Sequence, residues 1–358
     1  MRIRKPWQFA GSITLSVFIL IQTFALPSNQ INHVNYGITF SKYRAKTLGL
    51  DWKKAYQETL KLGFKSIRLP VYWNDIQKRQ DFPRSDLAEL EVGPLLKNWT
   101  SENTKYDFKD LDWQIKRARK NNTSIILAIG QKVPRWPECF NPDWINDPPS
   151  PGFGETSRQK ELLDFMAHIV RRYRKNPALL YWQVENEPRV PFGTCPPFDE
   201  NLFNQEIALV KKIDPNHPIL TTDSGERSFW FSQYKKADVF GNTLYQKVWH
   251  RWFGDYTFPF TPGFYRFKKR LVNRFAGDKK IINVELQGEP WGPKDLNEMS
   301  IAEQINYFSL NDLKNNILFS QKAEYDTTYL WGIEWWIYLE KNEHPEFIDY
   351  ISKLASSN

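Results

Sequence analysis

The sequence predicts an α/β protein that folds as a single-domain (β/α)8 TIM barrel. Three observations support this fold class: a length of 358 residues, eight short runs rich in β-branched and aromatic residues, and segments of helical periodicity between those runs. Strands that are apolar on both faces and alternate with helices form a parallel sheet covered by helices. Eight such units over roughly 320 residues favour a closed barrel. An open doubly wound sheet is the alternative, but GITFSKYRAKTLG, which runs on from the first strand, is not the glycine-rich phosphate turn of that fold.

The order of the predicted elements follows from these runs. The strands are residues 34–40, 66–73, 124–130, 178–187, 218–224, 238–246, 280–287 and 327–336, and the clearest helices are residues 51–63, 107–122, 158–175 and 300–319. In the first of these helices, Trp52, Tyr56 and Leu60 keep helical spacing, with Asp51 as N-cap and Gly63 as the stop. Long insertions after the second and third strands, residues 74–105 and 131–157, are expected to build one rim of the barrel.

The N-terminal segment, residues 1–28, has the pattern of an export signal. Three basic residues in the first five positions precede residues 9–26, which carry no charge. This pattern predicts either a secretory signal peptide or one uncleaved transmembrane anchor helix, and both remain open. Because the basic flank stays cytoplasmic, residues 29–358 are expected to be extracytoplasmic, either secreted or anchored to the membrane by the N-terminal helix.

The composition is that of a globular protein with many aromatic side chains. The chain has 15 tryptophans, whose flat faces either stack on sugar rings or fill the core. The net charge of +8 is spread along the chain, and the cluster RRYRK at 171–175 is typical of a solvated helix face. No nucleic-acid-binding module accompanies this charge, so no nucleic-acid partner is expected.

Two predicted strands end in acidic residues. The fourth strand ends in Asn186 and Glu187 before Pro188, and the seventh changes from apolar to acidic at Glu285. Because a barrel brings the carboxyl ends of its strands together around one mouth, the two glutamates are expected to face each other. A separation of about 5 Å would suit retaining glycoside hydrolysis.

From residue 34 to residue 350 the sequence resembles clan A of the glycoside hydrolases, most nearly the cellulase-like family 5 and its relatives. The most specific parts are Asn-Glu-Pro at 186–188 on the fourth strand and the glutamate on the seventh, and IRLPVYW, GNTLYQ and LWGIEWW on the second, sixth and eighth strands support them. The resemblance implies that residues 29–358 form a glycosidase-like catalytic domain. It implies a retaining enzyme that acts on β-linked oligo- or polysaccharides and needs no cofactor; we expect a monomer.

The resemblance also implies roles for five residues at the strand ends. Glu187 would be the general acid and base, and Glu285 the nucleophile. Glu187 must then be protonated to release the leaving group, so its pKa is expected to be raised by the neighbouring carboxylate and by partial burial. Arg68 matches an arginine beside the nucleophile, Tyr245 a tyrosine that donates to it, and Asn186 the residue that bonds the sugar 2-hydroxyl.

Two further acids lie close to this pair in the sequence. Glu289 is the rival nucleophile, but it follows a glycine in the loop, whereas Glu285 lies on the strand itself. Glu185 has the same strand parity as Glu187, one layer deeper, and is expected to pair with Arg68 or another base. For Glu187 and Arg68, a structural carboxylate and a plain ion pair are the alternatives.

Three tryptophans are candidates for contact with the substrate, and one segment departs from the family pattern. Trp331 looks like the stacking floor for the reacting sugar, with Trp136 and Trp335 as neighbours, and core filling is the alternative. Gln131 and Lys132 follow the third strand, where family 5 commonly has a histidine, so the exact family stays open.

The cysteines predict a disulfide, and the histidines do not predict a metal site. Cys139 and Cys195 lie in the loops after the third and fourth strands, which are neighbours in a barrel, and a disulfide between them is expected, with two free thiols as the alternative. The five histidines show no ligand spacing, so no metal site is expected. Three alternatives to a hydrolase remain: a carbohydrate-binding pseudoenzyme, a cell-surface transglycosylase, and a barrel enzyme of unrelated chemistry.

Overall fold

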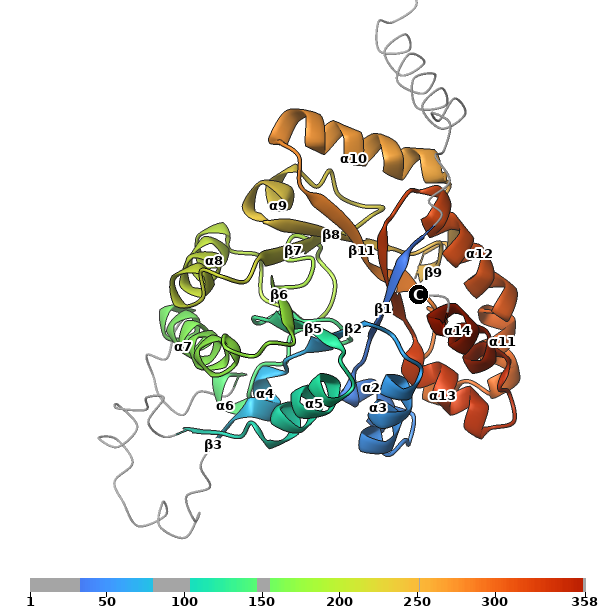
Figure 1. Cartoon of the computed structure of the whole chain (residues 1–358), viewed down its shortest axis with the longest axis horizontal. Coiled ribbons are helices and arrows are strands. Elements are labelled where there is room, and N and C mark those ends of the chain that lie inside the picture. The colour runs from blue at the N-terminus through green and yellow to red at the C-terminus, as the bar shows by residue number, and fades with distance from the viewer. Residues whose placement is uncertain (1–32, 80–103, 147–154, 251, 357–358) are drawn as a thin grey trace, which may run out of the picture.

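A closed barrel of eight parallel strands forms the centre of the molecule, with helices around it (Figure 1). The computed structural model describes residues 33–79, 104–146, 155–250 and 252–356. Around the barrel the strands follow chain order, with the first pairing the last: β1 (Asn35–Thr39), β2 (Ser66–Pro70), β5 (Ser124–Ile129), β6 (Leu179–Val184), β7 (Ile219–Asp223), β8 (Val239–Leu244), β11 (Lys280–Gln287) and β12 (Thr327–Trp331). The predicted barrel is confirmed.

The helices follow the strands in the predicted alternation. They are α2 (Lys42–Thr47), α3 (Trp52–Lys61), α4 (Trp73–Ile76), α5 (Lys109–Lys120), α6 (Asp143–Asn146), α7 (Glu155–Tyr173), α8 (Glu200–Ile213), α9 (Phe231–Lys236), α10 (Pro262–Ala276), α11 (Ile301–Tyr307), α12 (Leu310–Lys322), α13 (Ile333–Lys341) and α14 (Glu346–Ser356). Two antiparallel ribbons, β3 (Gln77–Arg79) with β4 (Thr104–Tyr106) and β9 (Lys247–His250) with β10 (Gly254–Thr257), extend loops after barrel strands. As predicted, the Asp51 carboxylate caps α3 by accepting from the amides of Lys53 and Lys54.

Several predicted strands end earlier in the structure, residues 66–73 at Pro70 and residues 178–187 at Val184 among them, and two predicted elements differ more. The predicted strand 327–336 ends at Trp331, because Gly332 at φ 123° turns the chain and α13 begins one residue later. The predicted helix 300–319 is two helices. Phe308 is extended, and Ser309 starts α12 with a capping box in which its hydroxyl accepts from the Asp312 amide.

The core has two parts that position the barrel mouth. Inside the barrel, a small cluster consists of Ile126, Leu220, Val239, Ile282, Val284 and Tyr329. A much larger cluster fills the space between strands and helices. Toward the mouth the buried side chains become polar, and Arg68 Nε donates to Gln183 Oε1 at 2.7 Å. The barrel is therefore plugged by apolar side chains below a polar layer.

Several sequence-based expectations fall on other parts of the chain. The predicted leader, residues 1–28, lies outside the described residues, as does most of the insertion at 74–105 and part of the insertion at 131–157. Among the helices that the structure does describe, none has both the length and the apolar character needed to cross a bilayer.

Candidate active site

The backbone after β6 places the Asn-Glu pair at the mouth. β6 ends before Glu185, and both Glu185 and Glu187 have positive φ values, 58° and 44°. Alternation along a strand therefore no longer governs which way these side chains point. The backbone N–H of Asn186 donates to Lys132 O at 2.8 Å, and the backbone N–H of Glu187 donates to Thr222 Oγ1 at 2.9 Å. Non-glycine residues in this conformation are kept there by their surroundings and cluster at functional sites.

A bulge in β11 delivers Glu285 to the same mouth. Val284 belongs to the cluster inside the barrel, and Asn283 faces outward and bonds Ser320 on α12. Simple alternation would turn Glu285 outward as well. However, the pairing with β8 shifts between Asn283 and Glu285, where two residues of β11 oppose one of β8. This bulge redirects the carboxylate, as bulges near active sites commonly do.

Glu285 has one donor for each carboxylate oxygen. Arg68 Nη1 donates to its Oε2 at 2.7 Å, and Tyr245 Oη donates to its Oε1 at 2.6 Å. Arg68 is completely buried, and burial raises the pKa of Tyr245 well above its usual value, so the phenol remains a donor. The structure thus brings together the three residues that the sequence grouped around the expected nucleophile.

Arg68 on β2 and Thr243 on β8 connect the residues at the ends of β6 and β11. Arg68 Nη2 donates to Asn186 Oδ1 at 2.8 Å while its other amino group holds Glu285. Thr243 pairs with Glu285 in the barrel register, and its hydroxyl donates to Glu187 Oε1 at 2.7 Å. Asn186 and Glu285 therefore share one guanidinium, and Glu187 is bonded to the strand residue that pairs with Glu285.

The electrostatics of the pair are unequal. Burial in the mouth and then the negative charge of Glu285 raise the pKa of Glu187 to about 8, although the Thr243 hydrogen bond opposes the rise. Glu187 is half-buried, so it combines a desolvated carboxyl with access from outside. A carboxyl group in this setting is protonated at neutral pH and can donate a proton.

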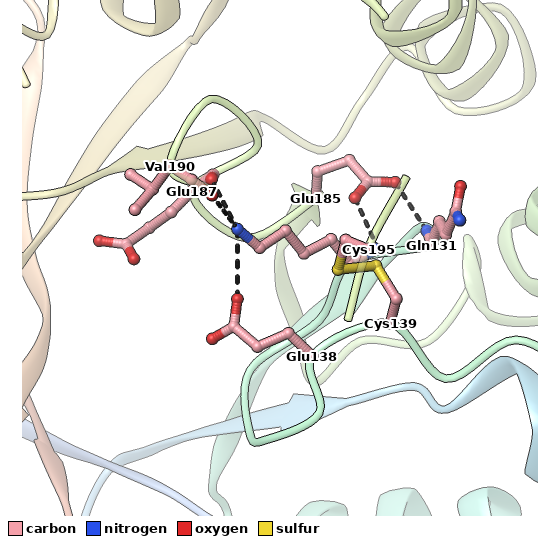
Figure 2. Close-up of a disulfide and its surroundings, with 8 residues drawn as sticks. Gln131, Glu138, Cys139, Glu185, Glu187, Val190 and Cys195 are labelled. Carbon is pink, nitrogen blue, oxygen red and sulfur yellow. Dashed lines mark hydrogen bonds and ion pairs between the residues drawn. A yellow bond between two sulfur atoms is a disulfide. The ribbon is translucent and has the colours of Figure 1, made fainter. Parts of the chain in front are cut away.

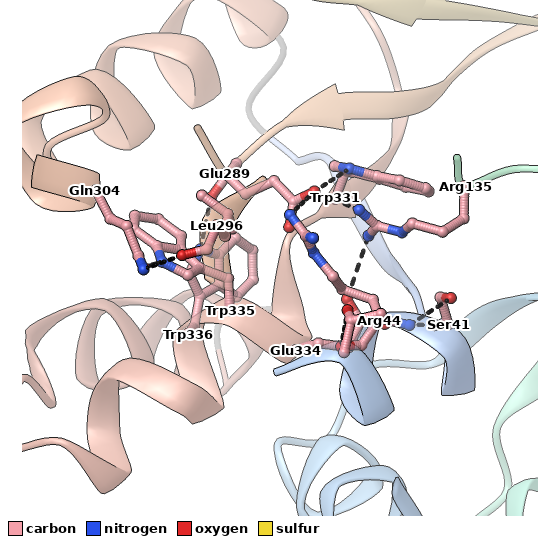
Figure 3. Close-up of polar contacts among 12 residues, drawn as sticks. Ser41, Arg44, Arg135, Glu289, Leu296, Gln304, Trp331, Glu334, Trp335 and Trp336 are labelled. Atoms are coloured by element: carbon pink, nitrogen blue, oxygen red, sulfur yellow. Dashed lines mark hydrogen bonds and ion pairs between the residues drawn. The ribbon is translucent and has the colours of Figure 1, made fainter. Parts of the chain in front are cut away.

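Glu289 lies in a separate cluster beside Trp331 (Figure 3). Its Oε1 accepts from Arg135 and from Trp331 Nε1 at 3.1 Å, and Arg44 Nη2 lies 3.5 Å away. Burial would raise the pKa of Glu289, but the charges of Arg135 and Arg44 hold it below its usual value. The Arg135 guanidinium lies 4.0 Å from the centre of the Trp331 ring, and only 5% of this tryptophan is exposed. Trp331 is therefore near the mouth but covered by an arginine on one face.

The other two predicted tryptophans lie in different environments. Trp335 is fully buried on α13, donates to Gln304 Oε1 at 2.8 Å and packs against Phe347. The expected sugar contact by Trp335 is therefore not possible in this structure, because α13 begins earlier than the predicted strand end and points the ring into the core. Trp136 is 56% exposed in the loop after β5.

Sequence reasoning missed two aromatic residues that connect Trp136 to the site. Ring centroids are 5.5 Å apart between Trp136 and Phe192, 5.0 Å between Phe192 and Trp291, and 5.1 Å between Trp291 and Tyr245. These residues, here called the aromatic row, come from the loops after β5, β6, β11 and β8. Trp291 ends the motif GEPW, and an aromatic residue so soon after the seventh strand was the available signal.

The predicted disulfide is confirmed. Cys139 and Cys195 are bonded and join the loops after β5 and β6 (Figure 2). The two cysteines line the same cavity as Glu185. The loops that carry Trp136 and Phe192 are therefore covalently tied to each other.

Glu185 does not pair with Arg68 as expected. Its two oxygens accept from the backbone amides of Gln131 and Lys132, at 2.6 and 2.7 Å (Figure 2). Lys132 Nζ in turn donates to Glu187 O at 3.1 Å and to Val190 O at 2.7 Å. The pair Gln131-Lys132, which departs from the family pattern, thus supports the backbone that carries Glu187.

The described residues offer no group of three or more His, Cys, Asp or Glu side chains arranged to hold a metal ion. The polar groups of the site are instead matched to one another, carboxylate to guanidinium, phenol or hydroxyl. The arrangement can protonate a leaving group on one side and attack with a carboxylate on the other.

A closed parallel barrel with glutamates at the carboxyl ends of its fourth and seventh strands defines a barrel of the glycoside hydrolase clan A type. The chain belongs to the cellulase family, glycosyl hydrolase family 5, whose family model matches residues 30–245.

Individual relatives are distant. Over 194 residues the chain is 23% identical to mannan endo-1,4-beta-mannosidase F of Aspergillus fumigatus, a match that covers 51% of this chain and 42% of that protein. The chain thus spans less than half the length of the curated relatives it matches. Among solved structures, beta-galactosidases from Halorubrum lacusprofundi and Marinomonas ef1 superpose with TM-scores of 0.51, at 12% and 11% identity. Each superposition covers 83% of this chain, with 52% and 54% of the other chain, and shows the common fold.

Proposed function

We propose that this protein is a retaining glycoside hydrolase that cleaves β-linked glycans by double displacement. Glu187 is the general acid and base, and Glu285 is the nucleophile. The observation that carries the proposal is the unequal pair at the mouth: Glu187, with its pKa raised to about 8, interacts with Glu285, whose oxygens accept from Arg68 and Tyr245. Two carboxyl groups in such different environments are what an acid and a nucleophile require.

In the first step, Glu285 attacks the anomeric carbon while protonated Glu187 gives its proton to the departing glycosidic oxygen. The C–O bond to the leaving sugar breaks, and an ester bond between Glu285 and the sugar forms. Asn186 presents its Oδ1 to Arg68, so its NH2 group is the part offered to the sugar 2-hydroxyl. That contact strengthens as the oxocarbenium-like transition state forms.

In the second step, the ionised Glu187 takes a proton from water, which attacks the anomeric carbon and releases Glu285. Glu187 returns to its protonated form, so the cycle conserves protons and needs no cofactor. Arg68 and Tyr245 hold the carboxylate of Glu285 in place before the bond forms and after it breaks.

The substrate is a β-1,4-linked glycan chain rather than a single sugar. The similarity to a mannan endo-1,4-beta-mannosidase supports this class, and the aromatic row supports contacts beyond the reacting sugar. The disulfide is consistent with an extracytoplasmic location. We further propose that the monomeric enzyme is secreted or held at the membrane by residues 1–28, depending on whether that segment is cleaved.

A panel of dyed β-glycans, together with a mechanism-based 2-deoxy-2-fluoro glycoside, tests this function. We expect hydrolysis of a β-1,4-linked glycan and covalent labelling of Glu285. Glu187→Gln should lower kcat/KM on the polysaccharide by about 10²–10⁴-fold. For an activated aryl glycoside, whose leaving group needs no proton, kcat/KM should be spared, whereas kcat should still fall because the second step loses its base. Glu298→Gln, an exposed glutamate in the loop after β11, is the matched control.

Three outcomes would overturn the assignment. Labelling of Glu289 would replace the nucleophile. Binding of glycans without turnover would favour a pseudoenzyme. Products longer than the substrate would identify a transglycosylase that uses the same residues.

A further inference from the structure

One buried carboxyl group near the site has no part in the reaction proposed above. Glu206 lies on α8 and is only 2% exposed. Its side chain and that of Glu185 line the same cavity of about 430 Å³, next to the disulfide and to the loop that follows Glu187. A buried carboxyl group outside an active site normally has an opposite charge or several donors as partners.

Glu206 has another carboxyl group as its partner. Its side chain hydrogen-bonds with Glu185, while its Oε2 receives no donor from any residue in the described part of the chain. A hydrogen bond between two carboxyl groups needs a proton on one of them. Glu185 already accepts from two backbone amides, which favours its charged form, so Glu206 is the one that keeps the proton.

The Glu185 carboxylate is held in a narrow space. A Cβ atom added at Gly130, which has φ 126°, would lie 2.3 Å from Glu185 Oε1. The carboxylate therefore packs directly against the backbone of residues 130–132. Through this contact Glu185 fixes Lys132, whose ammonium group holds the carbonyl oxygens of Glu187 and Val190 (Figure 2).

We propose that Glu206, as a neutral carboxylic acid, is a positioning residue for Glu187: it donates to Glu185, which fixes Lys132, which in turn holds the Glu187 backbone. This inference rests on the proposed function, because it concerns the placement of the proposed general acid. The relay matters because Glu187 has a positive φ, a conformation that persists only where neighbours enforce it. Small displacements of a catalytic group slow a reaction by orders of magnitude.

The charges around Glu206 agree with a neutral acid. Burial and then the negative charge of Glu185 raise the pKa of Glu206 well above its usual value. Asp199, which caps α8, adds a further negative charge on the same side. The cationic side chains along the cavity are Lys132, Arg158 and Arg189. Lys132 is already bonded to carbonyl oxygens and to Glu138 Oε2 at 3.3 Å, and Arg189 to Glu200.

Substitution of Glu206 tests the relay by activity. Glu206→Gln keeps a donor for Glu185 without any charge, and we expect kcat close to that of the wild type. Glu206→Leu removes the donor, and we expect kcat to fall by roughly 10–100-fold with KM nearly unchanged, because Glu187 is misplaced while the binding surface is intact. Gln205→Leu, at an exposed position one residue earlier on α8, is the matched control and should match the wild type.

An infrared measurement tests the proton itself without turnover. At a pH well above 8, where Glu187 has ionised, the wild type should keep a protonated-carboxyl band that Glu206→Gln lacks. If Glu206→Leu does not fold, the infrared comparison of the wild type with Glu206→Gln tests the inference without it. Equal spectra, or Glu206→Leu as active as the wild type, or Glu206→Gln as impaired as Glu206→Leu, would each overturn the inference. A wild type that hydrolyses no β-glycan would overturn the proposed function instead and leave the infrared result standing.

Discussion

At the level of single residues, Glu187 and Glu285 have the same side chain but different hydrogen-bond donors and different nearby charges. Glu285 lies between the donors Arg68 and Tyr245, whereas Glu187 has one hydroxyl donor, that of Thr243, and sits opposite a negative charge. The proposed division of labour between acid and nucleophile thus depends on side chains of other strands. These neighbours are as open to experiment as the glutamates themselves.

Thr243→Val removes the hydroxyl that donates to Glu187. The hydrogen bond favours the ionised carboxylate, so its loss should raise the pKa of Glu187 above about 8. The acid form is active and is lost as the pH rises through this pKa, so the alkaline limb of kcat/KM should move to higher pH. Thr221→Val removes a buried hydroxyl that donates to Gln233 O instead and should leave the limb in place. An unmoved limb in Thr243→Val would contradict the assignment of Glu187.

The two glutamates of the proposed acid and nucleophile pair could be located from strand ends, whereas their partners could be named only by resemblance. Glu187 and Glu285 could be found because each follows an apolar run. The orientation of Glu285 could not be derived, since alternation along β11 turns it outward and only the bulge returns it to the mouth. Two of the partners of Glu185 are backbone amides, which leave no trace in residue types.

At the level of elements, the loops after β5 and β6 behave as one unit. The disulfide closes a loop with a sequence separation of 56 residues. Replacing Cys139 and Cys195 together by serine should lower the free energy of unfolding by about 2–4 kcal/mol, because the unfolded chain regains freedom. Urea denaturation of the wild type and the double variant measures this. The wild type unfolded in the presence of a reductant should match the variant, and equal stability of all three would contradict the expectation.

The outer end of the aromatic row, at Trp136, should matter for long substrates only. Trp136→Ala removes an exposed ring, and the loss of about 0.5–1.5 kcal/mol of stacking should raise KM for a polysaccharide roughly 2–10-fold with kcat little changed. A short aryl glycoside, which does not reach Trp136, should be unaffected. Phe275→Ala, at an exposed position on α10, is the control for loss of a surface ring. An equal effect on both substrates would place Trp136 outside the glycan-binding surface.

The type and order of the helices and strands could be predicted from the sequence, whereas the residues at which they end were harder to predict. The eight strands were found because buried strands read as continuous apolar runs between helical segments. The run LWGIEWW hid a strand end, since apolar residues suit both β12 and α13, and only the positive φ of Gly332 separates them. This boundary decides that Trp335 belongs to the core.

At the level of the whole molecule, buried charges make stability depend on pH. Burial is the main cause that raises the pKa of Glu138 and Glu187 to about 8 and that of Glu334 to about 7. From about pH 5 to about pH 7 the folded protein keeps protons that the unfolded chain has released, so the free energy of unfolding should fall as the pH rises. Above about pH 7 the trend should flatten, because burial lowers the pKa of Lys268 to about 7 and of Lys269 to about 8, which acts with the opposite sign.

Urea unfolding at a series of pH values measures this trend. Glu334→Gln should reduce the slope between about pH 5 and about pH 7, whereas Glu298→Gln, at an exposed position, should not. A free energy of unfolding that rises across this range would contradict the raised pKa values.

The two-against-one pairing in β11 has a consequence for anyone who redesigns barrels. Because the extra residue resets the direction of the strand above Asn283, apolar side chains below it, such as Ile282, can be repacked without turning Glu285. The reverse also holds. Transplanting this active site onto a regular eight-stranded scaffold would require inserting a residue as well as the glutamate, since a substitution alone would aim the carboxylate at the surrounding helices.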